Sequence, residues 1–228
     1  MTITKHLTLI GAIALIGACT EPSAPPAAPS VDGSRPLHHL RWAPSAAPRQ
    51  FAAVRPGGNV GLVEAAPPAP SPLSANQVSF WAYTSQDASI QVNYLDADST
   101  WQPYVSLSVL SGSLLRRPDG SFFAAGDSIE ITLTFDTTEI VFEAEPSGLV
   151  FNPLVPATLK VWYGGTNPDF NLDGVVNWLD RLIENQLLGL STRLDADDPW
   201  DLLSALQSLL AKQFTASLLH FCGYAVDW

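Results

Sequence analysis

The twelve residues from Asp169 to Asp180 form the sharpest chemical motif in this sequence. They run Asp-Phe-Asn-Leu-Asp-Gly-Val-Val-Asn-Trp-Leu-Asp, so that oxygen-bearing side chains alternate at the start and recur toward the end. Calcium is a hard cation that takes roughly six to eight oxygen ligands, and a loop of about twelve residues can supply them. Gly174, at the sixth position, permits the sharp turn that such a loop needs. The spacing therefore predicts a calcium-binding loop.

This segment resembles the calcium loop of a dockerin repeat, position for position. The resemblance implies one calcium ion held by Asp169, Asn171, Asp173, the Val175 carbonyl, Asn177 and Asp180. It also implies that Val176 points inward and that a helix from Trp178 carries Asp180 into place. Dockerins use two repeats and only one is found here, so a dockerin-type protein partner is not expected.

His220 and Cys222 are a second candidate for chemistry, as a nucleophilic pair or as half of a zinc site. They lie two residues apart on an expected strand, so their side chains would face the same way. A catalytic pair needs a third group that orients the imidazole, and zinc needs roughly three or four ligands. The favoured interpretation is a core histidine and a buried thiol. No other spacing indicates a glycosidase, a serine hydrolase or a phosphate loop, so the chain is not expected to be an enzyme.

Tryptophan is frequent and could form a sugar-stacking face. The candidates are Trp81, Trp101, Trp162, Trp178, Trp200 and Trp228. Aromatic residues on strands usually belong to the core, so this interpretation requires tryptophan rings that are exposed and coplanar.

Past residue 76, apolar and polar residues alternate in short runs. These runs are Ile90–Tyr94, Val105–Val109, Ile129–Phe135 and Leu159–Tyr163. Period two over a short run is typical of a half-buried strand. Turn signals such as Asp119-Gly120 and Gly126-Asp127 separate the runs. The pattern predicts a mostly β fold, an antiparallel β-sandwich.

Two segments break this alternation. Trp178–Leu188 has apolar residues at helical spacing and precedes Gly189, which predicts a helix stopped by a left-handed cap. Residues 198–212 also have a helical pattern, with Asp198 as N-cap, Pro199 at the first position and a leucine-rich face.

Three segments resemble bacterial relatives of the sandwich domain found in ankyrins, zona-occludens proteins and netrin receptors. They are Gly126–Thr132, Glu145–Phe151 and His220–Val226. The resemblance covers most of residues 76–228 and implies strands after Trp200, so residues 198–212 have two competing interpretations. In some eukaryotic relatives a His-Phe-Ser tripeptide cleaves itself. Cys222 would be the nucleophile here, and autoproteolysis before Cys222 is one alternative function.

The N-terminus has the pattern of a secretory signal, with Lys5 followed by an apolar run from Leu7 to Ala18. The run is too short for a permanent membrane span, which needs about twenty apolar residues. Leu15–Cys19 resembles the lipobox of bacterial lipoproteins, which implies removal of residues 1–18 and a lipid on Cys19. In bacterial lipoproteins, an Asp directly after the lipidated cysteine tends to retain the protein in the inner membrane. That position is Thr20 here, so we expect this protein to be sorted to the outer membrane.

Composition divides the rest of the chain into a linker and a domain. Residues 20–75 hold twelve of the nineteen prolines, which predicts a disordered tether over residues 19–75. From Asn76 onward there are nineteen acidic and six basic residues. This balance argues against nucleic acid as a partner and permits cation binding. With Cys19 acylated, Cys222 has no partner for an intramolecular disulfide.

Together these features predict a lipid-anchored protein of the cell envelope. Its domain, residues 76–228, would be a β-sandwich with the calcium loop and a short helix inserted at about 166–189. The expected function is a non-catalytic structural or interaction module that engages an unknown partner protein. The alternative function is that of a carbohydrate-binding module in a cell-surface system.

Overall fold

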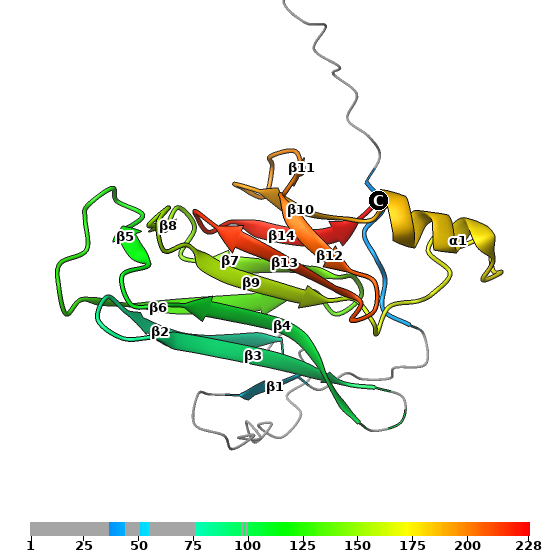
Figure 1. Ribbon diagram of the computed structural model, residues 1–228, viewed down its shortest axis with the longest axis horizontal. Helices are drawn as coiled ribbons and strands as arrows, with labels where there is room; N and C mark the ends of the chain where they lie inside the picture. The colour runs from blue at the N-terminus through cyan, green and yellow to red at the C-terminus, as the bar shows by residue number, and fades with distance from the viewer. Residues whose placement is uncertain (1–36, 44–50, 55–75, 97, 99) are drawn as a thin grey trace, which may run out of the picture. The chain divides into compact units, whose positions relative to one another are not determined.

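The computed structural model describes residues 37–43, 51–54, 76–96, 98 and 100–228. Two six-stranded antiparallel sheets pack face to face, which confirms the predicted sandwich (Figure 1). One sheet has the strand order β1-β3-β4-β9-β13-β12 and the other has the order β11-β10-β14-β7-β6-β2. A small sheet pairs β5 with β8.

The strands are short, and most are joined by tight turns. Their bounds are β1 Phe51–Val54, β2 Gln77–Tyr83, β3 Ala88–Leu95, β4 Trp101–Val109, β5 Leu114–Arg116, β6 Ser128–Phe135, β7 Val141–Glu145, β8 Val150–Phe151, β9 Ala157–Trp162, β10 Gly189–Arg193, β11 Asp201–Leu202, β12 Ala205–Ser208, β13 Gln213–Leu218 and β14 Gly223–Asp227.

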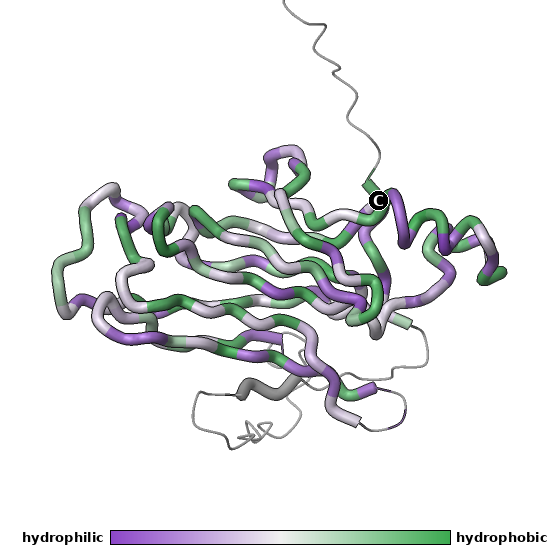
Figure 2. Tube along the Cα trace, viewed as in Figure 1, coloured by the Kyte–Doolittle hydropathy of each residue, from purple (hydrophilic) through white to green (hydrophobic). Residues whose placement is uncertain are grey.

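The predicted alternation determines which face of each strand is buried. In β6, Ile131, Leu133 and Phe135 point into the sandwich and are almost completely buried, while Glu130 and Thr132 face outward. Figure 2 shows the same alternation of hydrophobic and hydrophilic residues along neighbouring strands. The runs predicted at residues 90–94, 105–109 and 129–135 lie within β3, β4 and β6, and the run at 159–163 ends one residue beyond β9.

Aromatic rings from several strands meet in the core between the sheets. Tyr104 packs on Trp42 at a centroid distance of 4.7 Å and on Phe135 at 5.3 Å. Phe142 continues the cluster to Phe135 at 5.7 Å and to Tyr224 at 5.2 Å. Each such pair adds about 0.5–1.5 kcal/mol beyond the burial of its area. Because its rings come from both sheets, this cluster stabilises the packing of one sheet on the other.

Two segments assigned to the tether lie on the sandwich instead. Leu40 donates its N–H to the Val226 carbonyl at 2.8 Å, and Trp42 is buried in the aromatic core. Residues 51–54 form β1, which pairs with β3. The domain boundary predicted at residue 76 is therefore wrong for these segments, because Leu40 and Trp42 bury their side chains in the sandwich and residues 51–54 add a strand to its sheet, despite the proline-rich surroundings. Residues 1–36, including Cys19, lie outside the described residues.

The predicted helix after the loop is shorter and ends differently from the expectation. An α-helix, α1, spans Trp178–Leu182, and a π-helical turn, η1, spans Ile183–Leu187. Leu188 is already extended, and Gly189 begins β10 without a left-handed conformation. A Cβ on Gly189 would lie 2.5 Å from Leu202 Cδ1, so a larger residue there would displace the exposed Leu202 side chain; Gly189 does not form a left-handed helix cap.

The helical interpretation of residues 198–212 is wrong, and the strand interpretation is correct. The segment contains β11 and β12, and β12 forms a hairpin with β13. Pairing with the two sheets takes precedence over the local helical pattern, and it leaves Leu202, Leu206 and Leu210 at 77%, 79% and 99% exposure. Among the described residues, no helix has the length and apolar character to cross a membrane.

Candidate functional site

The predicted calcium loop connects β9 to α1 at one end of the sandwich (Figure 1). Before it, the Thr166 hydroxyl donates to the Tyr163 carbonyl at 2.7 Å, in a buried turn. Asp169 and Phe170, which begin the loop, are buried as well. The loop is therefore fastened to the sandwich at its start, while its tip around Val175 is exposed.

Asp180 closes the loop from the other end. Its Oδ1 accepts the N–H of Phe170 at 2.8 Å and that of Asn171 at 3.4 Å, and its Oδ2 accepts the N–H of Asn177 at 2.8 Å. In return the Asn177 side chain accepts the N–H of Leu179 at 2.7 Å, so that the two residues form a capping box for α1. This capping role was not predicted, although an Asn followed three residues later by an Asp is a signal of a helix N-terminus.

The electrostatics of Asp180 follow from these bonds. The side chain is only 2% exposed. Burial alone would raise the pKa of its carboxyl, but the N–H groups of Asn177, Phe170 and Asn171 outweigh burial and lower the pKa below its ordinary value. Asp180 is therefore a carboxylate at neutral pH, with its negative charge held between the start and the end of the loop.

Asp169 organises the turn at the centre of the loop. Its Oδ1 accepts the N–H of Asp173 at 3.2 Å, and its Oδ2 accepts the N–H of Gly174 at 2.8 Å. Gly174 has a φ of +88°, in the region that glycine adopts without strain. Leu172 is also left-handed, with a φ of +58°. These two reversals wrap the backbone around the Asp169 carboxylate.

The remaining predicted ligands line the exposed side of the loop. Asp173 accepts the N–H of Val175 at 2.9 Å and an N–H of the Asn171 amide at 3.0 Å. The Asn177 amide donates to the Val175 carbonyl at 3.0 Å. The structure thus brings all six predicted ligand residues into one hydrogen-bonded loop.

The donors of this loop suit calcium by type, because all of them are carboxylate, amide or carbonyl oxygens. The positions of these oxygens do not form a complete set of calcium ligands. The carboxylates of Asp169, Asp173 and Asp180 accept backbone N–H groups, and among the described residues no three His, Cys, Asp or Glu side chains gather in an arrangement that would hold a metal. Calcium binding would require these carboxylates to share their free lone pairs with the ion.

The expected inward position of Val176 is wrong. Its side chain is 59% exposed, and Val175 beside it is 60% exposed. Phe170 and Asp180, both buried, are the residues that anchor the loop. Because the loop projects from the end of the sandwich, Val176 is left facing solvent.

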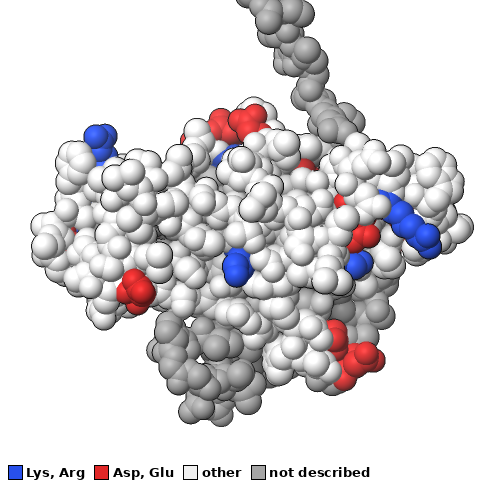
Figure 3. Space-filling view, viewed as in Figure 1, with Lys and Arg blue, Asp and Glu red and all other residues white. Residues whose placement is uncertain are grey.

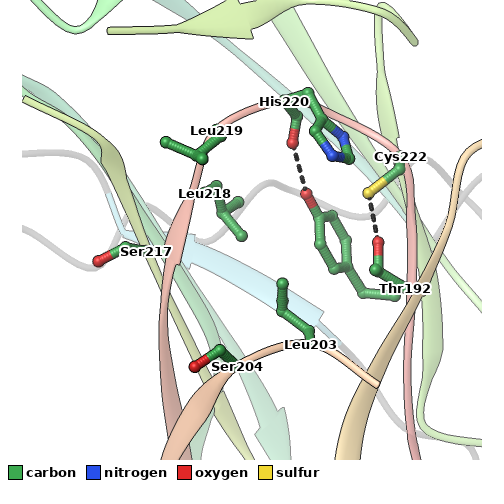
Figure 4. Close-up of a pocket in the computed structure, with 9 residues that line it drawn as sticks. Thr192, Leu203, Ser204, Ser217, Leu218, Leu219, His220 and Cys222 are labelled. Atoms are coloured by element: carbon green, nitrogen blue, oxygen red, sulfur yellow. Dashed lines mark hydrogen bonds between the residues drawn. The ribbon is translucent and has the colours of Figure 1, made fainter. Parts of the chain in front are cut away.

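His220 and Cys222 lie before β14 and not on it, which corrects their predicted placement on a strand. His220 is exposed, so its interpretation as a core histidine is wrong, whereas Cys222 is 3% exposed and is the buried thiol that was expected. Both line a mostly apolar cavity of about 200 Å³, with Leu203 and Ser204 at its opposite end (Figure 4). The Tyr224 hydroxyl donates to the His220 carbonyl at 3.1 Å, and Cys222 Sγ lies 2.6 Å from Thr192 Oγ1.

The chemistry of this cavity follows from its burial. Burial raises the pKa of the Cys222 thiol, although the hydrogen bond with Thr192 partly offsets it, and burial raises the pKa of Tyr224 well above its ordinary value. A thiol of raised pKa holds less thiolate at neutral pH than a free cysteine. Autoproteolysis before Cys222 stays a prediction, which the intact mass of the purified chain would test.

The tryptophans divide into buried and exposed groups. Trp42, which the sequence analysis did not single out, is in the core. Trp200 lies beneath the Arg193 guanidinium, and Trp228 stacks on His38. Trp81 on β2 and Trp178 on α1 are 51% and 72% exposed. The exposed rings thus come from different elements of the fold.

No protein-family model, curated protein or solved structure matches the chain.

Proposed function

We propose that this protein is a lipid-anchored, extracytoplasmic interaction module without catalytic activity, whose loop from Asp169 to Asp180 binds one calcium ion. The observation that carries the proposal is the closure of the loop on Asp180. A buried carboxylate ties both ends of a loop that bears five oxygen-donating side chains and the Val175 carbonyl.

The ion would be held by Asp169, Asn171, Asp173, the Val175 carbonyl, Asn177 and Asp180. When bound, calcium would neutralise the repulsion among three carboxylates placed close together in the chain. Asp169 follows β9 and Asp180 belongs to α1, so the ion would link the sandwich to its only α-helix among the described residues. The expected result is a stiffer end of the sandwich where a partner could bind.

Calcium titration of residues 20–228 tests the metal site. We expect one ion per chain with a Kd of about 0.1–1 mM, the range of extracellular calcium modules. Because the ion binds the folded loop, it should raise the melting temperature as its concentration exceeds the Kd. Asp173→Ala should abolish both responses. Asp119→Ala, which removes an exposed aspartate from a turn elsewhere, is the matched control and should respond like the wild type.

The calcium proposal fails if about 5 mM calcium, well above the expected Kd, produces neither heat nor a melting shift. It also fails if Asp173→Ala responds as the wild type does.

The membrane anchor rests on Cys19 and the residues before it. Cys19→Ser should release the protein from the detergent phase into the aqueous phase, because the lipid would no longer be attached. Cys222→Ala removes the other cysteine and should leave partitioning unchanged. Membrane fractionation would then test the outer-membrane location expected from Thr20. Detergent partitioning that survives Cys19→Ser would refute the anchor.

A further inference from the structure

A cleft of about 390 Å³ opens at the edge of the sandwich where the chain passes from β2 into β3. It lies apart from the calcium loop in the sequence and uses none of its residues. The side chains that give it chemical character are Trp81, Tyr83, Gln86, Asp87, Ser89 and Glu130. Its volume is within the range of about 300–1,000 Å³ that small-molecule sites occupy.

The strand positions of β2 place two aromatic rings on one face of the sheet. Trp81 and Tyr83 are two residues apart and face outward, while Ala82 between them is completely buried. Trp81 pairs directly with Glu130 of β6, so a carboxylate stands beside the exposed indole. The pairing of β2 with β6 extends over the whole of β2. The aromatic platform is therefore held by a continuous ladder and not by a loop.

The polar side of the cleft is also ordered. Asp87 Oδ1 accepts the N–H of Ser111 at 2.8 Å, which fixes the carboxylate at the turn before β3. None of the five ion pairs between described residues involves Asp87 or Glu130, and no Lys or Arg belongs to the lining of this cleft. The cleft thus combines two uncompensated carboxylates with the Gln86 amide and the Ser89 hydroxyl.

We propose that this cleft binds a short neutral oligosaccharide. A pyranose ring has an apolar face of C–H groups that can cover the half-exposed indole of Trp81, which removes apolar area from water. Its hydroxyls can donate to Asp87 and Glu130 in charge-assisted hydrogen bonds, and they can donate to and accept from Gln86 and Ser89. An acidic sugar would be repelled by the two carboxylates.

A cationic ammonium ligand suits the cleft less well. Binding of such a cation depends on several aromatic faces that surround it. Here the rings of Trp81 and Tyr83 come from one face of one strand and do not surround a ligand, and neutral hydrogen-bonding groups are also part of the lining. These groups match the alternating donors and acceptors of a sugar, and an ammonium group with methyl substituents could not use them.

The test is calorimetric titration of the full-length protein in a detergent without a sugar headgroup. The probes are cellotriose, mannotriose and chitotriose, with trigalacturonic acid and choline as comparisons. We expect at least one neutral trisaccharide to bind with a Kd of about 1 mM or tighter, and trigalacturonic acid not to bind. Trp81→Ala should weaken binding by at least about tenfold, because exposed aromatic residues dominate the affinity of such contacts.

Trp178→Ala is the matched control, since it removes a tryptophan from α1 that is even more exposed than Trp81 and lies outside the cleft. It should bind the same trisaccharide within about twofold of the wild type. Far-ultraviolet circular dichroism should show both variants folded, as expected when an exposed ring is removed. The proposal is overturned if no neutral trisaccharide binds at about 10 mM, if Trp81→Ala binds as well as the wild type, or if only choline binds. Calcium is omitted, so the result is independent of the loop.

Discussion

The aromatic core and the loop from Asp169 to Asp180 are stabilised by opposite kinds of contact. The core is a set of large rings buried between the sheets, with Tyr104 and Phe142 almost inaccessible to solvent. The loop contains few buried apolar groups and is held by carboxylate oxygens that accept backbone N–H groups. Ring packing tolerates a change of residue type if volume is kept, whereas each acceptor in the loop serves particular donors. The two regions should therefore respond to different substitutions.

The charge distribution follows the same division. In Figure 3, charged side chains are sparse over strands β4, β9 and β13 and gather toward the margins of the molecule. On the face that Figure 3 shows, most of the charged side chains therefore lie away from the middle of the sheet, where solvent screens them.

The largest effect is expected for truncation in the core. Phe142→Ala removes a ring that packs on Phe135 and Tyr224, and it leaves a cavity between the sheets. We expect a loss of about 3–5 kcal/mol in the free energy of unfolding, measured by urea denaturation. Phe122→Ala is the control, because that ring is 62% exposed and lies beneath the Arg116 guanidinium, and the substitution should cost less than about 1 kcal/mol. Equal losses in the two variants would contradict the role assigned to the aromatic core.

The second largest loss of stability is expected when the Asp180 carboxylate is removed from the loop. Asp180→Ala leaves the N–H groups of Phe170, Asn171 and Asn177 without their partner. We expect a loss of about 2–4 kcal/mol, measured by urea denaturation with a calcium chelator present. Asp173→Ala removes an exposed acceptor from the same loop and should cost about 1 kcal/mol or less.

The chelator separates the structural role of Asp180 from its proposed role as a calcium ligand. If the two variants lose the same amount under these conditions, the loop does not depend on the buried carboxylate.

The sequence predicts these two regions to different extents. Alternation was sufficient to find β3, β4 and β6, although burial alternates strictly only in β6; in β3 the register shift at Val92 and Asn93 leaves consecutive residues buried. Alternation did not predict β2. Phe80 and Trp81 are adjacent aromatic residues, so the sequence does not distinguish the side chain that packs against the core from the one that faces solvent. Leucines at helical spacing in residues 198–212 were misleading, since pairing of β12 with β13 depends on residues elsewhere in the chain.

The loop was predictable in composition but not in arrangement. Its six oxygen donors and Gly174 could be recognised from spacing alone. The burial of Asp180 and the exposure of Val176 could not, because both depend on how the loop meets the end of the sandwich. The position of Trp42 was not predicted, because its proline-rich surroundings are typical of a linker. Its ring nevertheless packs against Tyr104.

The smallest expected effect is a pH dependence specific to the loop. The pKa of Asp180 is lower in the folded protein than its ordinary value of 3.8. A lowered pKa means that the carboxylate contributes stability above the ordinary pKa, and that this contribution is lost as pH falls through the folded value. Asp180→Asn cannot titrate, so the difference in unfolding free energy between wild type and this variant should narrow below about pH 4.

The core provides the internal comparison for this titration. Phe142 has no ionisable group, so the difference between wild type and Phe142→Ala should stay constant over the same acid range. Other aspartates with lowered pKa values, such as Asp127 and Asp136, change the stability of every variant equally and cancel in each difference. The narrowing should be smaller than the cost of Asp180→Ala, because a protonated carboxyl still offers an oxygen to the N–H groups. A difference for Asp180→Asn that stays constant down to the acid unfolding of the wild type would show that the loop does not need the charged form.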